Sequence, residues 1–394
     1  MGVVIVGASL AGLRTAEALR VRNYGEPITM IGAEPGLPYD RPPLSKQFLA
    51  PDHSGATPFL RDAAAFAELD VELRASTRAT GLDLDRRRVQ LSDGDELPYE
   101  HLVIATGADA RKFALGKGLN GFHGLRTVSD AEAIRRQFDR GPRVLVLGGG
   151  FIGAEVAAAA RNRRLEVDLV EILPAPMSAG LGFEVGALLA KMHADNGVRV
   201  RCGVTVTRVS GGQTVEQVEL SDGTVLDVDV VIVGLGVTPA TEWLVGSGLS
   251  LDNGVTCDAG LRAEGRADVY AVGDVARWAH PLFERSMRIE HWTNANEHAD
   301  VVASGIVGET RVAQAVPYVW SDQYGHKIQL VGRPTADDEL TVVEDPVEGR
   351  HLAVYERAGR VVGMLAIDSP RQLMRGRKAI AAGIPATELV AGLH

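Results

Sequence analysis

The sequence predicts an α/β protein of two similar domains, the second inserted into the first, followed by a smaller α+β domain. A strand, a glycine-rich loop, a helix and a second strand with an acid near its end occur twice, at 3–34 and 143–171. Each copy is followed by a hairpin pattern and a further apolar strand, at 89–108 and 218–239. After residue 317, antiparallel strand patterns end in a helix. Two glycine-loop units in one chain predict two nucleotide-binding sites.

The first unit begins with the apolar strand 3–6, which runs into GASLAG at 7–12 and then into a helical pattern. In such a loop the first glycine allows a tight turn and the last lets the helix pack on the strand. The helix N-terminus then directs N–H groups at a pyrophosphate. Ser9 replaces the usual middle glycine, and a residue this small still lets a phosphate approach. With Glu34 beyond the second strand, we expect a nucleotide at this loop.

The second unit carries GGGFIG at 148–153, which fits the same pattern without a departure. Glu171 follows its second strand, where a carboxylate accepts hydrogen bonds from an adenosine ribose and repels a 2′-phosphate. The next residues, ILPAPMSAG, contain no arginine, so NADH is favoured over NADPH. Glu155 has two interpretations: an acid in the first helical turn that suits the helix dipole, or a group near the nicotinamide.

A third acid, Asp274, follows the apolar strand in VYAVGDVA at 269–276. A carboxylate at a buried strand end needs a polar partner. With two nucleotides predicted, that partner is a ribityl hydroxyl, and the alternative is an N-cap for a following helix.

Composition and charge exclude several classes of function. Asp and Glu outnumber Lys and Arg by 51 to 41, which disfavours nucleic acids and anionic membranes as partners. No signal peptide or stretch of roughly 20 apolar residues is present, so we expect a cytoplasmic protein. The two cysteines, Cys202 and Cys257, are far apart and form no CxxC, so we expect inert thiols and no redox-active disulfide. The histidines show no metal-ligand spacing, and we expect no metal.

Eight motifs occur in a fixed order: GASLAG, PYDRPPLSK, ATGA, GGGFIGAE, GVTP, VYAVGDVA, RIEHWTNANEHA and PYVWSDQYG. Together they resemble the FAD-dependent, NADH-using ferredoxin reductases of bacterial Rieske dioxygenase and cytochrome P450 systems, relatives of putidaredoxin and rubredoxin reductases. The resemblance implies a glutathione reductase-like pair of Rossmann-like domains. We assign 1–108 and 237–317 to the FAD-binding domain, 109–236 to the NAD-binding domain and 318–394 to the C-terminal α+β domain.

The resemblance also implies the site residues. Those expected to bind FAD are Gly7, Ser9, Ala11, Gly12, Glu34, Arg41, Lys46, Ala79, Thr106, Gly107, Arg126, Gly273, Asp274 and Trp292. Those expected to bind the nicotinamide dinucleotide are Gly148, Gly150, Ile152, Gly153, Glu155, Glu171 and Gly236. Lys46, Glu155 and Trp320 are the expected catalytic residues. Because prolines restrict the backbone, PYDRPPLSK should hold Lys46 rigidly beside the flavin; the alternative is an exposed lysine on a proline-rich turn.

Two features remain open on sequence grounds. Trp320 is either near the flavin edge that faces the ferredoxin or an ordinary core tryptophan. The cations at Arg371, Arg375, Arg377 and Lys378 form either a docking patch for an acidic ferredoxin or a solvated helix face.

The function that this reading predicts is electron transfer from NADH through FAD, one electron at a time, to a [2Fe–2S] ferredoxin that feeds a P450 or Rieske oxygenase. The absence of a cysteine pair favours direct transfer to an external acceptor. An NADH oxidase or diaphorase, and an NADH-sensing flavoprotein resembling apoptosis-inducing factor, are the alternatives. Both a monomer and a homodimer are consistent with these motifs.

Overall fold

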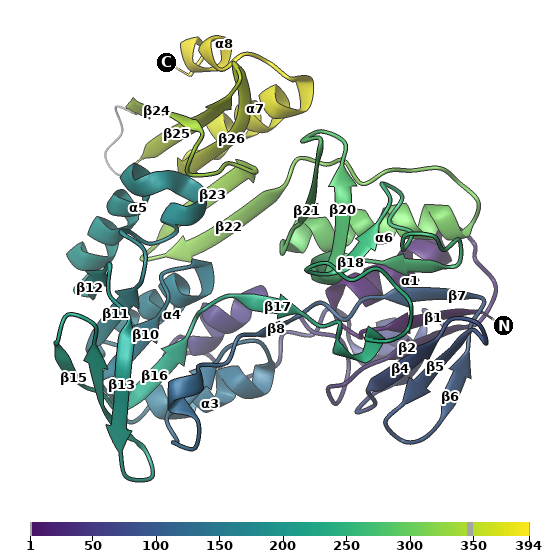
Figure 1. Cartoon of the computed structure of the whole chain (residues 1–394), viewed down its shortest axis with the longest axis horizontal. Coiled ribbons are helices and arrows are strands. Elements are labelled where there is room, and N and C mark those ends of the chain that lie inside the picture. Colours follow the sequence, from purple (N-terminus) through teal and green to yellow (C-terminus); the bar gives the residue numbers. More distant parts are fainter. Residues whose placement is uncertain (1, 345–349, 394) are drawn as a thin grey trace. The chain divides into compact units, whose positions relative to one another are not determined.

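The computed structural model describes residues 2–344 and 350–393 (Figure 1). The chain forms two compact units. The first comprises Met1–Asp40, Pro58–Asp109 and Thr238–Pro317, and the second comprises Arg41–Thr57, Ala110–Val237 and Tyr318–His394. The predicted α/β class with a C-terminal α+β domain is confirmed, whereas the exact three-domain boundaries stay a prediction.

The first unit is built on a five-stranded parallel sheet in the order β19-β7-β1-β2-β3. Its strands are β1 (Val3–Val6), β2 (Ile28–Ile31), β3 (Glu72–Arg74), β7 (His101–Ile104) and β19 (Val269–Ala271). The helices α1 (Leu10–Val21) and α6 (Trp292–Ile306) pack against each other. Continuous runs of β-branched residues such as VVIV fit strands that are buried on both faces.

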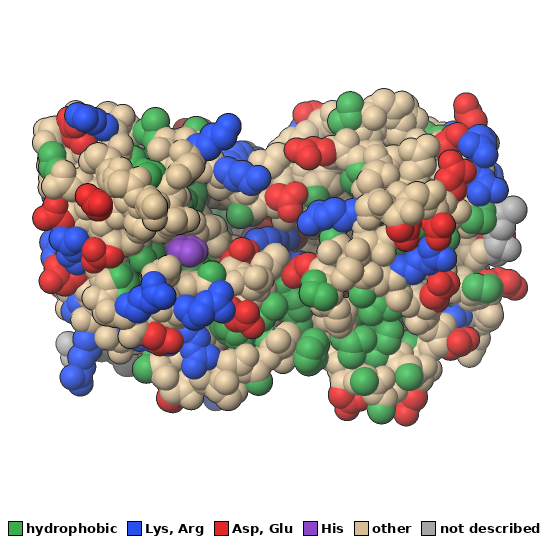
Figure 2. Space-filling model, turned by 90° about the horizontal axis from the view of Figure 1, so that it is seen from below, with side chains coloured by type: hydrophobic (Ala, Val, Ile, Leu, Met, Phe, Trp, Pro, Cys, Tyr) green, Lys and Arg blue, Asp and Glu red, His purple; other side chains and the backbone are tan. Residues whose placement is uncertain are grey.

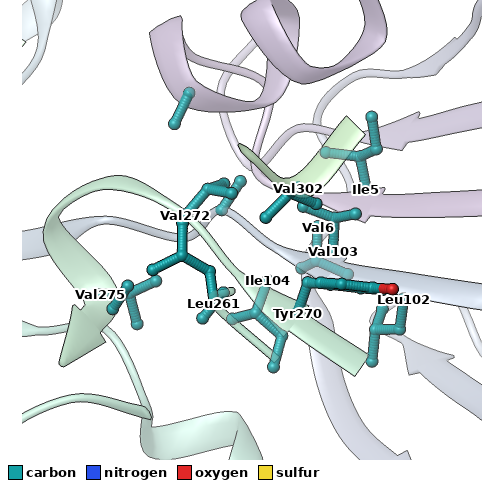
Figure 3. Close-up of a cluster of buried hydrophobic side chains, with 14 of the residues drawn as sticks. Ile5, Val6, Leu102, Val103, Ile104, Leu261, Tyr270, Val272, Val275 and Val302 are labelled. Carbon is teal, nitrogen blue, oxygen red and sulfur yellow. The ribbon is translucent and has the colours of Figure 1, made fainter. Parts of the chain in front are cut away.

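The core of this unit lies where the central strands meet α6. Figure 3 shows Ile5, Leu102, Ile104 and Tyr270 from three adjacent strands in one cluster with Val302 of α6, and all five are buried. This cluster fixes the carboxyl ends of β1 and β7, from which the first glycine loop and the ATGA turn start.

Smaller elements complete the first unit. They are α2 (Ala63–Ala67), the antiparallel strands β4 (Ala79–Asp83), β5 (Arg88–Leu91) and β6 (Glu96–Pro98), the sheet of β18 (Val255–Cys257), β20 (Ala276–His280) and β21 (Arg285–Arg288), and the 3-10 turns η4 (Glu242–Leu244) and η5 (Gly273–Val275). The hairpin expected at 89–99 is therefore confirmed. The paired strands β8 (Ala108–Ala110) and β17 (Val237–Pro239) contain two of the points at which the chain passes between the two units.

The second unit repeats the parallel architecture, in the order β12-β11-β10-β16-β9. Its strands are β9 (Phe122–Gly124), β10 (Val144–Leu147), β11 (Val167–Glu171), β12 (Arg199–Cys202) and β16 (Val230–Val233). Its helices are α3 (Val128–Phe138), α4 (Phe151–Asn162) and α5 (Ser178–Asp195), and β13 (Val206–Gly211), β14 (Val215–Leu220) and β15 (Val225–Asp227) form an antiparallel sheet. In both parallel sheets, the strand before the glycine loop lies where the strand order reverses, which is where α/β sheets bind ligands.

Tyr318–His394 adds a five-stranded antiparallel sheet in the order β22-β23-β26-β25-β24. The elements are β22 (Tyr318–Gln323), β23 (His326–Gly332), β24 (Glu339–Glu344), β25 (His351–Arg357), β26 (Arg360–Ile367), α7 (Pro370–Ala382) and α8 (Ala386–Ala391). A buried apolar cluster joins this sheet to α5, through Leu181 and Leu189 on the helix and Ile328 and Leu365 on the strands. The expected strands and closing helix are confirmed, and β22 is an additional strand within PYVWSDQYG.

The short turns η1 (Pro42–Ser45) and η2 (Gln47–Leu49) also belong to the second unit, where they pack on α3 and α4. The turn η3 (Ala114–Gly116) lies near β13. Among the helices of residues 2–344 and 350–393, none has the length and hydropathy needed to cross a membrane.

Candidate functional site

The two glycine loops both have a first glycine with a positive φ that is packed against a neighbouring carbonyl group. Gly7 and Gly148 have φ values of 125° and 95°, a region that L side chains rarely adopt. A Cβ atom would lie 2.1 Å from the Ala105 carbonyl oxygen at Gly7, and 2.5 Å from the Gly234 carbonyl oxygen at Gly148. Each loop therefore turns tightly against the chain leaving the neighbouring strand.

The last glycine of each loop places the helix directly against that turn. A Cβ atom at Gly12 would lie 2.0 Å from the Gly7 oxygen, and one at Gly153 would lie 2.0 Å from the Gly148 oxygen. Only glycine allows this approach, so the N-termini of α1 and α4 sit close behind their loops. The unpaired N–H groups of a helix N-terminus favour an anion such as a pyrophosphate.

The middle positions, Ser9 and Gly150, are the N-caps of α1 and α4. Gly150 has an ordinary φ of −73°, and a Cβ atom there would meet no atom of the described residues within 4 Å. Neither backbone strain nor packing within the chain explains this glycine. The space beside Gly150 is therefore open, whereas the corresponding position of the first loop carries the Ser9 side chain.

The acid of the second loop is fixed by backbone groups. Glu171, buried at the end of β11, accepts hydrogen bonds from the Gly149 N–H at 2.7 Å and the Leu173 N–H at 2.9 Å. Ile152, in the first turn of α4, and Ile172, directly after Glu171, are exposed apolar residues on the segments that follow the loop and β11. The carboxylate is thus held at the glycine loop, and its expected role in binding a ribose stays a prediction.

The acid of the first loop has a partner that the sequence analysis missed. The buried Tyr39 hydroxyl donates a hydrogen bond to the Glu34 carboxylate. The signal was present, since this tyrosine belongs to PYDRPPLSK, but its role depends on how the chain folds back. Ala79, expected near the adenine, is the first residue of β4.

Two other residues expected to bind the flavin, Gly273 and Asp274, follow the carboxyl end of β19 in the first unit. Gly273 has φ 71°, and a Cβ atom there would lie 3.1 Å from the Ala11 side chain, so the Gly273–Asp274 turn lies beside the first turn of α1. The N-cap of η5 is Val272, so the alternative role of Asp274 as an N-cap is wrong. His298 Nδ1 accepts a hydrogen bond from the Gly273 N–H at 3.2 Å.

The ATGA turn and the start of α6 supply the remaining expected contacts. Thr106 donates a hydrogen bond to the Ala240 carbonyl at 2.8 Å, and Gly107 has φ 68°. The Trp292 indole donates to Asp40 Oδ1 at 2.9 Å, which fixes the N-terminus of α6. All of these predicted assignments to FAD stay predictions.

In the second unit, Lys46 is held against Glu155. The lysine Nζ lies 2.9 Å from Glu155 Oε1, and the two side chains are only 10% and 3% exposed. Lys46 also donates to the Pro42 carbonyl at 3.2 Å. The alternative of an exposed lysine on a proline-rich turn is therefore wrong. Glu155 lies beyond the first turn of α4, so its alternative role as a first-turn acid is also wrong.

Two serines complete this cluster, and the sequence analysis missed both. Ser45 donates to Glu155 Oε2, and Ser321 of β22 donates to Oε1 at 2.7 Å. Each hydroxyl hydrogen bond to an ionised carboxylate offsets part of the cost of burying that charge. The buried carboxylate therefore has three donors, from η1, from the residue after it and from the C-terminal sheet.

Four further expected residues lie in the second unit. Arg41 donates to the Arg126 carbonyl, which brings these two arginines together. Gly236, after β16, has φ 83° and accepts from the Arg111 N–H at 3.0 Å. Trp320 is half-buried and stacks on Tyr318, with ring centroids 5.8 Å apart and planes 20° apart.

The cations of α7 gather on one side of the helix. Arg371, Arg375 and Lys378 are exposed and line an open surface hollow with Pro370 and Met374. Arg377 is less exposed and does not line it. On the face shown in Figure 2, basic and acidic side chains are interspersed.

Neither cysteine forms a disulfide. Burial raises the pKa of Cys257 to about 12, and burial and then Glu171 raise the pKa of Cys202, so both thiols stay protonated at neutral pH. This supports the prediction of inert thiols. Among residues 2–344 and 350–393, no three His, Cys, Asp or Glu side chains are grouped to hold a metal ion.

Comparison with known proteins adds the family. Residues 1–299 match the family described as "Pyridine nucleotide-disulphide oxidoreductase", and residues 318–391 match "Reductase C-terminal". The chain is 40% identical to the anthranilate 1,2-dioxygenase system ferredoxin–NAD(+) reductase component of Burkholderia cepacia, over 96% of this chain and 94% of the relative. It is 35% identical to rhodocoxin reductase of Rhodococcus erythropolis, over 98% and 91%.

Solved structures agree with this likeness. The covalent putidaredoxin reductase–putidaredoxin complex matches with a TM-score of 0.93 at 32% identity, over 99% of this chain and 98% of the other. The ferredoxin reductase for the CYP199A2 system from Rhodopseudomonas palustris matches with a TM-score of 0.92 at 32% identity, over the whole of both chains.

Proposed function

The chain belongs to the pyridine nucleotide-disulphide oxidoreductase family and, within it, to the ferredoxin reductases, and we propose that it passes electrons from NADH through FAD to a [2Fe–2S] ferredoxin. The ferredoxin in turn feeds a P450 or Rieske oxygenase. The observation that carries the proposal is the pair of glycine loops, one in each unit, that share a positive-φ first glycine and a last glycine packed against it. FAD, when bound, accepts two electrons from a nicotinamide and releases them singly, which couples a two-electron donor to a one-electron carrier.

The chain's own residues bind and orient the two dinucleotides. The loops that begin at Gly7 and Gly148 receive the pyrophosphates at the N-termini of α1 and α4. Glu34 and Glu171 accept hydrogen bonds from the adenosine riboses. Lys46 holds a positive charge beside the flavin, where a cation favours the electron-rich reduced ring.

NADH rather than NADPH is the proposed donor because the Glu171 carboxylate is fixed at the second glycine loop. Two backbone N–H groups hold its carboxylate at the loop, so it cannot easily turn away from a bound ribose. A 2′-phosphate would meet this negative charge, and residues 172–180 contain no Lys or Arg to neutralise it. Like charges placed together cost several kcal/mol, which corresponds to a preference for NADH of about 100-fold or more.

Electrons leave the protein without a disulfide intermediate. The raised pKa values of Cys202 and Cys257 keep both thiols unreactive. The ferredoxin docks at the exposed cations Arg371, Arg375 and Lys378 of α7, because ferredoxins are acidic and opposite charges accelerate encounter.

Steady-state reduction of cytochrome c tests this proposal. We expect reduction to require both NADH and an added [2Fe–2S] ferredoxin from a bacterial dioxygenase system, and NADPH to replace NADH poorly. Rapid NADH consumption by O₂ without ferredoxin would favour the oxidase alternative. Slow turnover with every carrier, together with association of the protein on NADH addition, would favour the sensor alternative.

A further inference from the structure

The Lys46–Glu155 pair is connected to a line of buried polar side chains on β22. Ser321 and Gln323 alternate along this strand and point to the same side, and both are almost fully buried. The Gln323 amide donates to Ser321 Oγ at 2.9 Å, and Ser321 Oγ donates to Glu155 Oε1 at 2.7 Å. Buried polar residues in a β-strand are costly unless they satisfy other buried groups.

The direction of these hydrogen bonds is fixed by the donors. Because the Gln323 NH₂ group donates to Ser321, the serine oxygen has an acceptor role toward it, and the serine hydrogen is available for Glu155. A hydroxyl that accepts one hydrogen bond donates a stronger one, so the two bonds reinforce each other. Glu155 Oε1 then receives hydrogen bonds from both Lys46 and Ser321.

Beyond Gln323, the line of buried polar side chains ends at His193, which carries no charge at neutral pH. Burial lowers the pKa of His193 to about 4, an effect that the nearby Gln323 side chain partly opposes. His193 Nδ1 lies 2.7 Å from the hydroxyl of Tyr324, whose own pKa burial raises. At neutral pH these residues add no charge, so the only charges in the line are those of Lys46 and Glu155.

We infer that Ser321 and Gln323 are positioning residues, which fix the Glu155 carboxylate as the acceptor for Lys46 and so set the charge that the lysine presents to the flavin. This rests on the proposed function in one respect, namely that Lys46 acts on the flavin. The consequence is that the C-terminal sheet, through β22, tunes a group on the proline-stiffened segment of residues 38–46.

Removing the serine hydroxyl has a definite electrostatic consequence. In Ser321→Ala, Lys46 and Ser45 still donate to Glu155, but the negative charge of its carboxylate is less compensated. A more negative surrounding disfavours the reduced flavin. We expect about a tenfold shift toward the oxidised form, which is about 30 mV more negative for a two-electron couple.

The test is an anaerobic dye titration of the flavin midpoint potential in the holoprotein, without any nicotinamide. Gln323→Met keeps Ser321 and should shift the potential in the same direction by a smaller amount. Because Gln323 acts through Ser321, Ser321→Ala/Gln323→Met should equal Ser321→Ala alone. Ser321→Thr keeps the hydroxyl and should restore most of the potential.

The matched control is Ser304→Ala. Ser304 of α6 is also fully buried, but it lies in the first unit and its hydroxyl has no hydrogen-bond partner among the described residues. The flavin midpoint potential of Ser304→Ala should equal that of the wild type. A potential in Ser321→Ala that is unchanged or more positive, or additive shifts in the double variant, would overturn the inference.

The outcomes also separate this inference from the proposed function. If NADH does not reduce the wild-type flavin but the dye titration shows the expected order of variants, the proposed function fails and the positioning role stands. If NADH and ferredoxin support rapid turnover while Ser321→Ala and Gln323→Met match Ser304→Ala, the positioning role fails and the proposed function stands.

Discussion

Removing Lys46 tests how much the second unit depends on its buried ion pair. In Lys46→Met, an apolar side chain of similar length leaves the Glu155 carboxylate with only Ser45 and Ser321 as donors. At an effective dielectric constant near 20, unit charges 2.9 Å apart attract by about 6 kcal/mol, before the cost of dehydrating them is subtracted. Breaking a buried pair typically costs about 3–5 kcal/mol. Since two hydroxyl donors remain, we expect Lys46→Met to lower the free energy of unfolding by about 3 kcal/mol, the lower end of this range.

A second substitution should recover most of that loss. In Lys46→Met/Glu155→Gln the buried charge is gone, while the glutamine amide still accepts from Ser321 and donates to the Ser45 oxygen. We expect the double variant to recover about 2 kcal/mol relative to Lys46→Met. NADH-driven reduction of the flavin should stay slow in both variants, because both lack the lysine.

The assay is urea unfolding at pH 7 with saturating FAD, followed by circular dichroism. Midpoints are compared across the wild type, Lys46→Met, Glu155→Gln and the double variant. A loss below about 1 kcal/mol in Lys46→Met would mean that water reaches the pair and that the burial argument is wrong. A double variant less stable than Lys46→Met would show that the carboxylate was not the source of the cost.

Three other predictions concern the nicotinamide loop, the choice of donor and pH. Gly150→Ala should fold as stably as the wild type but bind NADH at least tenfold more weakly in a fluorescence titration. Gly153→Ala should also lose stability, because its Cβ would lie 2.0 Å from the Gly148 oxygen. Equal stability of the two variants would contradict this prediction. Glu171→Gln should reduce the preference for NADH over NADPH in kcat/KM by about tenfold or more, and an unchanged ratio would remove the carboxylate from the argument. His193, with a pKa lowered from 6.5 to about 4, binds a proton more readily in the unfolded chain, so stability should fall as pH decreases from about 6.5 to 4, by up to roughly 3 kcal/mol. Urea midpoints of His193→Asn should lose that part of the pH dependence; an unaltered slope would show that His193 is not its source.

Patterns that act over short distances along the chain were predicted well from the sequence. The glycine loops, their flanking strands and the hairpin at 89–99 depend on residues a few positions apart, and local sterics decide them. The first helix begins at Leu10 rather than at residue 13, because the N-cap Ser9 lies inside the loop. Helix ends depend on capping geometry, which spacing alone does not determine.

The environment of Glu155 could not be predicted in the same way. Its partners lie 109 positions away at Lys46 and 166 positions away at Ser321, and only the packing of η1 and β22 against α4 brings them together. The alternative of a first-turn acid came from local helix rules, which do not register a distant lysine. The strand β22 was missed for a related reason, since its polar Ser321 and Gln323 face other buried polar groups and weaken the apolar pattern.

The most direct test of the central claim is anaerobic stopped-flow absorbance of the holoprotein, mixed first with NADH and then with an oxidised [2Fe–2S] ferredoxin of a bacterial dioxygenase system. The proposed function predicts rapid bleaching of the flavin band with NADH, followed by rapid recovery as the ferredoxin is reduced. A flavin that bleaches slowly with NADH, or one that is reduced but recovers only when O₂ is admitted, would contradict it.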